Sequence, residues 1–434
     1  MLIRSSRDDL AGGLFISSDI GIRQHCVSGF LNEKPLMAMA NIFDILGPIM
    51  RGFSSSHTAG AVRMGAYFRR LHGGLPSKIT ITLYGSYAKT AESHGTLNGL
   101  AAGLLGMTAD DKNLPNAWTL LKRRCSIDLK YSEEDAGHPN AALLQSTEHT
   151  VLFHSVGGGL VRVIKKDGKE VNQLLRDFNS GEGFRSFAEI KDIDAAIQTE
   201  IKRLGLDSKT FWELIKKRWV IMKEGIKTYH GALSNEIATL TFNAIKKLKA
   251  NNAWKPIVAA PTAGSCGVLP SALQLAKNPI KALVVAGLVG EIIANRASVA
   301  GADLGCQAEV GASSAMAAAA LAYDHSADME KAESAASIAL SSFLGLVCDP
   351  VGGFVVIPCA FRNMAGALTA AGSAEIALTG YKFPIPFDEV VDAMKEIGRS
   401  MPPALKETAE GGLAATPTGR RLRCRRRLAM DLPD

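Results

Sequence analysis

Three of the seven cysteines in the 434-residue chain fall within one segment that is rich in small residues. Cys306 lies in the string GCQAEVG, Cys348 begins CDPVGG, and Cys359 lies in IPCAFRN. Their spacing is far wider than the paired CxxC spacing of zinc ribbons and ferredoxins. The glycines and prolines beside them allow the backbone to approach a bound group, which indicates a cofactor site. A free cysteine is also an ordinary buried apolar residue, so spacing alone leaves both interpretations open.

A second polar motif, the loop SSSHT, lies far upstream. Gly47, Pro48 and Gly52 end a short predicted helix before it, and a second predicted helix follows it and stops at Gly73 and Gly74. The free amides and the positive dipole end of a helix N-terminus attract a carboxylate or a phosphate. Serine and threonine at such a position are also ordinary helix caps, which is the alternative interpretation.

The string VAAPTAGSCGVL at residues 258–269 is a third motif. Its glycine-rich turn opens a helix, which again makes an anion site in principle. Cys266 in this turn has no paired cysteine nearby in the sequence, so we expect a buried thiol without a chemical role.

The elements that must position these motifs differ between the two halves of the chain. Residues 78–85 and 125–131 alternate apolar and polar side chains, as half-buried strands do. Two further strand-like runs lie within 150–171, and residues 95–106 form a predicted helix of small residues. The first half is therefore predicted to be α+β.

Strand patterns disappear beyond a charged stretch that contains the loop NSGEG, and we place a domain boundary near residue 190. Apolar residues then recur at helical spacing. The sequence thus predicts an α+β domain over 1–190 and an all-α domain over 191–434. The predicted helices of the second domain span 193–204, 211–227, 234–250, 280–298, 309–323, 332–347, 359–371 and 387–399.

The composition is that of a globular protein, because 47% of the residues are hydrophobic and the length suits about two to three domains. The odd number of scattered cysteines gives no disulfide framework, so we expect a reducing cytoplasm. The first residues lack a signal-peptide core, and prolines and glycines interrupt the longest charge-free run, 256–276. We therefore predict neither export nor a membrane partner.

Positive charge is concentrated at the end of the chain. Six arginines between positions 420 and 427 supply most of the net charge of +7. A basic tail can bind nucleic acid by releasing counterions. No aromatic platform or reading helix accompanies this one, so we predict a solvated, disordered end and no nucleic-acid partner.

Together, the motifs resemble those of one family, the iron–sulfur-dependent L-serine dehydratases, also named L-serine ammonia-lyases. In that family a beta-type domain with SSSHTAG precedes a helical alpha-type domain with PTAGSCG, GCQAEVG, CDP, and PC followed by RN. All these strings occur here in that order, and the resemblance covers most of the chain. It implies a beta-type α+β substrate-binding domain, an alpha-type helical iron–sulfur domain and a homodimer.

By this resemblance, Cys306, Cys348 and Cys359 bind three irons of a [4Fe-4S] cluster and leave the fourth iron open. Hydroxide is a poor leaving group, and an open iron acts on its oxygen as a Lewis acid. The implied reaction eliminates water from L-serine and gives pyruvate and ammonia. Some family members end in a cysteine that occupies the fourth iron. Cys424 lies among arginines, so it is either such a ligand or an exposed thiol.

The resemblance also implies which residues hold the amino-acid substrate and move its protons. His57 in SSSHT and His138 in HPN are the expected acid–base residues, because a base with a pKa near neutrality suits abstraction of the Cα proton. A lone histidine at a helix start is also often a capping or surface residue. The expected substrate-binding residues are Ser54, Ser55, Ser56, Thr58, Asn140, Thr262, Ala263, Gly264, Ser265, Arg362 and Asn363.

The sequence departs from the family pattern in three places. Phe53 replaces the usual proline before SSSHT, SHGTL at 93–97 replaces a Gly-His-Gly-Thr-Asp string, and residues 229–242 lack a Gly-Gly-Asp-Ala type segment. Two alternatives therefore stay open: an iron–sulfur lyase for another β-substituted amino or hydroxy acid, and a cluster-free binding protein. No lysine lies in a convincing setting for pyridoxal phosphate.

Overall fold

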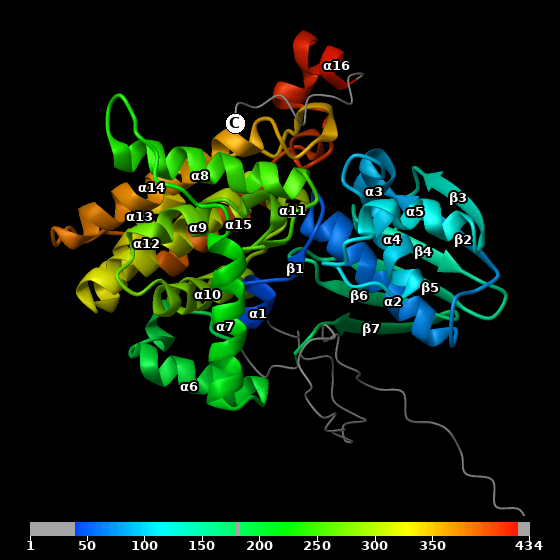
Figure 1. The fold of residues 1–434 in the computed structure, drawn as a ribbon, viewed down its shortest axis with the longest axis horizontal. Coiled ribbons are helices and arrows are strands. Elements are labelled where there is room, and N and C mark those ends of the chain that lie inside the picture. Colours follow the sequence, from blue (N-terminus) through cyan, green and yellow to red (C-terminus); the bar gives the residue numbers. More distant parts are fainter. Residues whose placement is uncertain (1–39, 179–182, 424–434) are drawn as a thin grey trace, which may run out of the picture.

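The computed structural model describes residues 40–178 and 183–423, and it has two unlike parts that lie side by side (Figure 1). The sheet part, from the first half of the chain, contains a mixed sheet with helices. The helical part, from about residue 190 onward, is mostly helices. The predicted fold class, α+β followed by all-α, is confirmed. The boundary at residue 190 itself stays a prediction.

Six strands form the sheet. From one edge to the other they are β3 (Ser126–Ser132), β2 (Lys78–Tyr84), β4 (Ala141–Gln145), β5 (Thr150–Ser155), β6 (Val161–Lys166) and β7 (Lys169–Leu175). β2 and β3 run parallel, and every other neighbouring pair is antiparallel. The strands predicted at 78–85, 125–131 and within 150–171 are confirmed. β4, with the sequence AALLQ, has no alternation from which it could have been predicted.

Small residues let the helices of the sheet part pack closely. A Cβ added at Gly103 would lie 2.0 Å from the carbonyl oxygen of Val62, and one added at Gly65 would lie 2.3 Å from that of Leu100. Only glycine fits where two helix backbones approach this closely, so this contact fixes α2 against α4. The helices of this part are α2 (Gly60–Leu71), α3 (Gly85–Thr90), α4 (Thr96–Leu105) and α5 (Ala117–Lys122).

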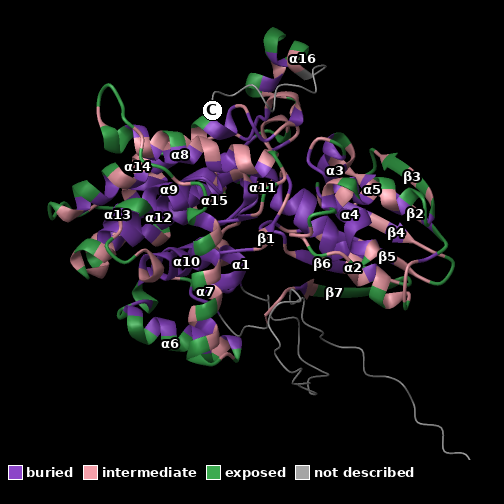
Figure 2. Ribbon diagram, in the orientation of Figure 1, coloured by how far each residue is buried: buried purple, intermediate pink, exposed green. Residues whose placement is uncertain are grey.

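One helix lies at the centre of the helical part. It is α12 (Val310–Ser326), which contacts α10, α13 and α14. All of its residues from Val310 to Ala322 are buried, as the burial colours show (Figure 2). A helix that is apolar on every side must be covered on every side. The other helices are α6 (Ile193–Leu204), α7 (Ser208–Lys223), α8 (Asn235–Asn252), α9 (Val268–Ala272), α10 (Pro279–Arg296), α11 (Gly301–Leu304), α13 (Met329–Ser341), α14 (Cys359–Leu378), α15 (Phe387–Ser400) and α16 (Pro417–Arg423).

The predicted helices of the second half are confirmed, with differences in length. The helix predicted over 359–371 is α14, which continues to Leu378. The helix predicted over 332–347 is α13, which ends at Ser341. The chain turns at Gly345, whose φ of 83° lies in the left-handed region that glycine favours. After this turn, the carbonyl of Leu346 accepts the amide of Gln307 at 3.1 Å. The turn brings the residues before Cys348 beside the segment that follows Cys306.

The two parts are tied together near the start of the described chain. α1 (Ile42–Ile45) packs on α10, and its side chains belong to the core of the helical part. An antiparallel pair then joins β1 (Ile49–Met50) to β8 (Ile257–Val258). These short strands directly precede the motifs SSSHT and PTAGS, and the amide of Ala263 donates to Oγ of Ser55 at 3.4 Å. The pairing therefore brings two distant motifs together.

The predicted disordered basic end is wrong for its first residues. α16 continues the chain as a helix from Pro417 to Arg423. Thr416 caps it by accepting the amide of Gly419 at 3.0 Å, and proline at the first helical position is compatible with a helix start. Cys424 and the arginines after it lie outside the described residues, as does almost all of the N-terminal extension.

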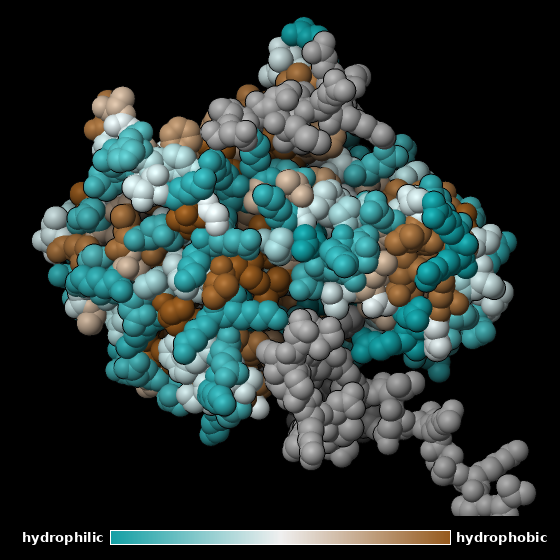
Figure 3. Space-filling view, in the orientation of Figure 1, coloured by the Kyte–Doolittle hydropathy of each residue, from teal (hydrophilic) through white to brown (hydrophobic). Residues whose placement is uncertain are grey.

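No helix within 40–178 or 183–423 has both the length and the apolar character needed to cross a membrane. On the face shown in Figure 3, hydrophilic residues alternate with separate apolar areas.

Candidate active site

Side chains from both parts of the molecule line one pocket where the parts meet. The three cysteines of the predicted cofactor site reach this pocket from three separate segments: the turn before α12, the loop after α13 and the first residue of α14. The sheet part and the loop that precedes it contribute Phe53, Ser54 and His94. The helical part contributes Gly264, Cys306, Glu309, Cys348, Pro350, Val355, Cys359 and Glu407.

The three thiols are buried and close enough to influence one another. Burial raises the pKa of Cys306 to about 12 and raises the pKa values of Cys348 and Cys359 well above their usual range. The charges of Glu309 and of the neighbouring thiolates add to the effect. Thiolates gathered in a dry pocket need positive charge among them, and a metal centre supplies it. The donor set therefore fits a thiolate-bound metal centre.

Two charged side chains lie against the thiols. Oε2 of Glu309 is 3.9 Å from Sγ of Cys348, and burial raises the pKa of this carboxyl. Arg362 donates to the carbonyl of Val347 at 2.8 Å and pairs with Asp349, also at 2.8 Å. The guanidinium therefore fixes the loop that carries Cys348. Its predicted role in substrate binding stays a prediction.

Asn363 holds the PTAGS turn against α14. Its Oδ1 accepts the amide of Gly267 at 2.9 Å, and its Nδ2 donates to the carbonyls of Gly264 and Cys359 at 2.7 and 2.8 Å. Within the turn, Oγ of Ser265 donates to the carbonyl of Ala260 at 3.2 Å. Both side chains thus stabilise the turn, whereas Gly264 lines the pocket. Thr262 and Ala263 belong to the same turn.

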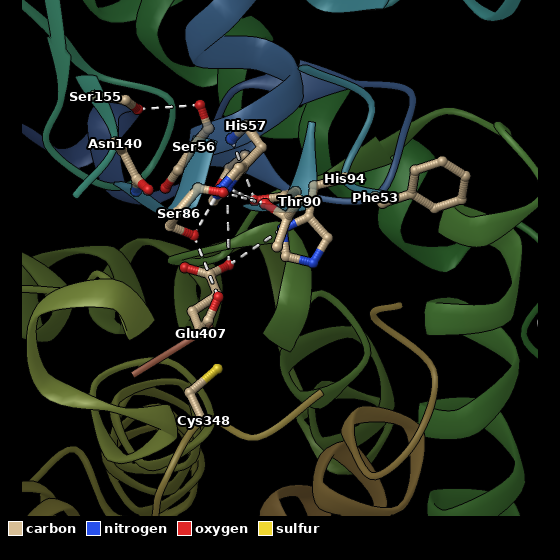
Figure 4. A network of polar contacts seen from close by, with 12 residues as sticks. Phe53, Ser56, His57, Ser86, Thr90, His94, Asn140, Ser155, Cys348 and Glu407 are labelled. Carbon is tan, nitrogen blue, oxygen red and sulfur yellow. Dashed lines mark hydrogen bonds and ion pairs between the residues drawn. The ribbon is translucent and has the colours of Figure 1, made fainter. Parts of the chain in front are cut away.

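His57 lies at the centre of a polar network on the opposite side of the pocket (Figure 4). A turn of π-helix over Ser55–Ala59 precedes α2, and the Ser54 hydroxyl caps it by accepting the amide of His57. The ring Nδ1 lies 3.2 Å from Oγ of Ser54, and Nε2 lies 3.2 Å from Oγ of Ser86. The predicted position of SSSHT at a helix N-terminus is confirmed.

The network assigns the tautomer of His57. Oγ of Ser86 donates to the carbonyl of Glu407 at 3.2 Å, so this hydroxyl accepts from the ring N–H on Nε2. Nδ1 then carries a lone pair, and the hydroxyl of Ser54 donates to it. The neutral ring thus presents a proton acceptor, Nδ1, beside Ser54, which lines the pocket.

His94 and Glu407 form a group of three with His57. Nδ1 of each histidine lies 3.9 Å from Oε1 of Glu407, and the two rings meet edge to face at 4.6 Å. Burial lowers the pKa of His57 well below its usual value and that of His94 to about 4, so both rings are neutral at pH 7. Burial also raises the pKa of Glu407 well above its usual value. Because both rings are neutral, their contacts with Glu407 are not ion pairs.

The imidazole ring of His94 is fully buried. Within the described chain neither of its ring nitrogens reaches a partner. The backbone of Gly353 lies near the ring and opposes the fall of the His94 pKa, because it favours the charged ring. It does not form a hydrogen bond of normal geometry with either ring nitrogen. A buried polar group without a partner is costly, which indicates a missing ligand.

His138 and Asn140 lie just before β4. Nδ1 of His138 accepts the amide of Asn140 at 3.0 Å, and its Nε2 is 3.7 Å from Oδ1 of Asp303 on α11. Asn140 is fully buried, and both polar atoms of its side chain lack a partner among the described residues. Figure 4 shows this side chain close to Ser56 and Ser86. Its amide is therefore an unsatisfied polar group beside the SSSHT loop.

The remaining residues of SSSHT hold the loop in place. The hydroxyl of Thr58 donates to the carbonyl of His94 at 2.7 Å. The carbonyl of Ser56 accepts from the hydroxyls of Tyr87 and Ser155 at 2.7 and 3.0 Å. These bonds fix the backbone on which His57 is mounted.

Sequence reasoning did not single out four residues of the site. His94 lies in the string SHGTL and Glu309 in GCQAEVG, so each stood inside a recognised motif. Ser86 and Glu407 belong to no such motif, and only the fold brings them to the pocket. None of the residues that line the pocket comes from 229–242, the segment that departs most from the family pattern.

Comparison with known proteins agrees with the architecture. The family model of the serine dehydratase beta chain matches residues 41–157, and that of the serine dehydratase alpha chain matches residues 142–414. An L-serine dehydratase from Helicobacter pylori strain J99 is 30% identical over 438 residues, which cover 84% of this chain and 96% of that protein. One from Streptomyces coelicolor is 29% identical over 449 residues, which cover 86% and 98%.

A shorter relative matches the helical part more closely. The probable L-serine dehydratase alpha chain of Bacillus subtilis is 49% identical over 195 residues, which cover 42% of this chain and 65% of that protein. The order of the two matched regions is the order of the sheet part and the helical part. The chain therefore belongs to the serine dehydratase family, with its beta-chain and alpha-chain regions in one polypeptide.

Proposed function

We propose that this chain is an L-serine ammonia-lyase, which eliminates water from L-serine and yields pyruvate and ammonia. One observation carries the proposal: three buried cysteines of the helical part and a buried pair of neutral histidines from the sheet part meet at the same junction. The names of the relatives support the same reaction.

Cys306, Cys348 and Cys359 would hold a [4Fe-4S] cluster. The raised pKa values of their thiols support this assignment, because cations would stabilise the thiolates. When bound with one iron open, such a cluster supplies a Lewis acid that helps hydroxide to leave. Cys424 stays a candidate ligand for the fourth iron.

His57 is the proposed acceptor of the Cα proton, at Nδ1. Ser86 keeps the ring proton on Nε2, and the lowered pKa keeps the imidazole neutral and able to accept a proton at pH 7. Oε1 of Glu407, at 3.9 Å, would stabilise the imidazolium that forms. His138 is the alternative base: its Nδ1 accepts the backbone amide of Asn140, whereas Nδ1 of His57 accepts a side-chain hydroxyl that can rotate away, and its Nε2 faces Asp303.

The substrate would be held between the two parts. Asn140 offers an unpartnered amide to the substrate carboxylate, with the hydroxyls of the SSSHT loop beside it. Gly264 brings the backbone of the PTAGS turn to the pocket, and Phe53 and Val355 give it apolar walls that exclude water. The aminoacrylate that leaves the site tautomerises and is hydrolysed to pyruvate and ammonia.

The test is an anaerobic purification followed by iron and sulfide assays and measurement of pyruvate release from L-serine. We expect about four irons per chain and pyruvate formation from L-serine but not from D-serine. A bound cluster with product only from L-threonine or L-cysteine would favour a related lyase. A helical protein that takes up no iron after reconstitution would favour a cluster-free binding protein.

We also propose that the chain forms a homodimer in the cytoplasm. The support is the resemblance to the family, because α12 is already covered within one chain and offers no face to a second copy. Light scattering during gel filtration tests the assembly, because a single chain has a mass of 46.1 kDa and a dimer has twice that.

A further inference from the structure

We infer that His57, His94 and Glu407 form a binding site for a borderline divalent cation such as Zn²⁺, beside the three cysteines, whose pocket His94 and Glu407 also line. Each residue offers one ligand atom, and these atoms lie within 4.8 Å of one another. Zinc binds imidazole nitrogen and carboxylate oxygen at about 2.0–2.2 Å, which places neighbouring ligands roughly 3.3 Å apart. The Nδ1 atoms of His57 and His94 each lie 3.9 Å from Oε1 of Glu407. Side-chain movements of about an ångström would therefore bring the three atoms to zinc-binding distances.

The surroundings of the histidines support a ligand role. A histidine that binds metal through one nitrogen typically donates its other N–H to an oxygen, which fixes the ring. His57 has such a partner, because its Nε2–H donates to Ser86. Its Nδ1 lone pair lies beside Glu407, and an ion there would replace the Ser54 hydroxyl that now donates to Nδ1 at 3.2 Å. His94 provides an independent observation, because it is fully buried and, within the described chain, neither nitrogen has a hydrogen-bond partner.

The backbone that carries Glu407 is fixed by hydrogen bonds. The amide of Glu407 donates to the carbonyl of Cys348 at 2.8 Å, and the amide of Cys348 donates to that of Leu405 at 2.8 Å. These bonds pair the two segments as a short parallel bridge. Two imidazoles and one carboxylate suit Zn²⁺, Fe²⁺ or Co²⁺ better than Ca²⁺ or Mg²⁺, which prefer sites made of oxygens alone. The site exists only where the sheet part and the helical part meet.

Cation binding here has a consequence for catalysis. A bound ion would occupy Nδ1 of His57, the atom proposed to accept the Cα proton, so it would inhibit turnover while the cluster iron stays in place. This consequence rests on the proposed function. The binding itself does not, because it follows from the three ligand atoms and their surroundings.

The experiment adds Zn²⁺ alone to the anaerobically purified, iron-loaded protein. After gel filtration we expect about one zinc per chain with the iron content unchanged, and X-ray diffraction at the zinc edge should show an anomalous peak between the three side chains. The variants His94→Gln and Glu407→Gln should weaken zinc binding at least about tenfold, since each removes a ligand. His149→Gln, which alters a surface histidine paired with Asp167, should bind zinc as the parent does.

Several results would overturn the inference: no zinc retained by the parent, zinc that displaces iron, a peak elsewhere, or unchanged binding in both ligand variants. If Glu407→Gln does not fold, His94→Gln and the anomalous peak still decide. The two proposals fail separately. A protein that forms pyruvate from L-serine but neither binds zinc nor is inhibited by it would contradict the cation site only. A protein that binds zinc at this site but is inactive on L-serine would contradict the proposed function only.

Discussion

The two parts of the molecule meet the same junction with different chemistry. The sheet part contributes hydroxyls and neutral imidazoles, and most of these satisfy one another through hydrogen bonds, as Ser54, His57 and Ser86 do. The helical part contributes thiols and carboxylates whose charged forms are destabilised by burial. It provides Arg362 beside them, but that guanidinium is already paired with Asp349.

This difference shows which groups depend on a bound ligand. Ser54, His57 and Ser86 satisfy one another and stay preorganised without one, whereas His94 and Asn140 have no side-chain hydrogen-bond partner among the described residues. Three buried thiols without enough positive charge beside them need a cation to ionise. Changes in the two parts should therefore have different effects, loss of cofactor in one and loss of turnover in the other.

Cys348→Ala should have the largest effect, the loss of nearly all bound iron. The variant removes one of the three thiols of the helical part that are proposed to bind the cluster. Iron and sulfide per chain and the visible absorption spectrum measure the result. Cys125→Ala, which removes a buried thiol from the sheet part, is the matched control and should keep its iron. A Cys348→Ala protein with a full iron content would show that the helical part does not hold the cofactor through this thiol.

His57→Gln should keep its iron and lose turnover by roughly 10²–10⁴-fold, the usual contribution of a general acid or base. Glutamine preserves polarity but cannot accept a proton at neutral pH. Steady-state pyruvate release and iron content together check this outcome. His72→Gln, in the same part but facing Glu148 on the surface side, serves as the control and should turn over normally. Normal turnover by His57→Gln would exclude this ring from the mechanism.

Glu291→Gln should change how the stability of the helical part depends on pH. Burial raises the pKa of Glu291 to about 7, although Arg203 lies 2.9 Å away and opposes the shift. The native state then binds more protons than the unfolded state between the ordinary value of 4.5 and about 7, so stability is highest below 4.5 and falls as pH rises through 7. The variant removes this slope and gains up to about 3 kcal/mol at pH 8.

Urea denaturation at pH 5 and pH 8 measures that difference. Arg203 keeps Glu200 as a partner in the variant, so no buried cation is left alone. Glu330→Gln, which alters an exposed carboxylate paired with Lys382, should retain the parental slope. An unchanged slope in Glu291→Gln would mean that this carboxyl is not responsible for the pH dependence.

Ser155→Ala should have the smallest effect, a loss of about 1 kcal/mol in unfolding free energy. Its hydroxyl donates to the carbonyl of Ser56, which keeps a second donor in Tyr87. Thermal unfolding and turnover both test this redundancy. The control is Ser342→Ala, which removes an exposed hydroxyl that donates to the carbonyl of Ile338. A loss above about 3 kcal/mol, or a large fall in turnover, would show that the loop carrying His57 depends on this one bond.

Local signals account for the parts of the fold that the sequence predicted. The helix predicted over 193–204 has those bounds because Asp192 caps its start and Gly205, in the left-handed region, ends it. Motif strings led to the three cysteines and to His57, which the fold brings to one junction. Such signals lie within a few residues of the feature that they predict.

What could not be predicted depends on contacts between distant segments. Ser86 and Glu407 are 321 residues apart, and neither has a local pattern that points to the other. Their contact arises from the way the sheet part packs on the helical part. The buried network of Glu200, Arg203 and Glu291 was missed for the same reason, because helical periodicity alone predicts apolar side chains at buried positions.

The pairing of the Glu407 backbone with Cys348 has a consequence for biosynthesis. This backbone closes the junction by pairing with Cys348, long after the cysteines and histidines have been translated. A nascent chain that has exposed all three thiols still lacks this wall until residue 407 has left the ribosome. A group inserted before that point would therefore enter a site that is still open. A product terminated between Cys359 and Glu407 would carry the three thiols without this wall.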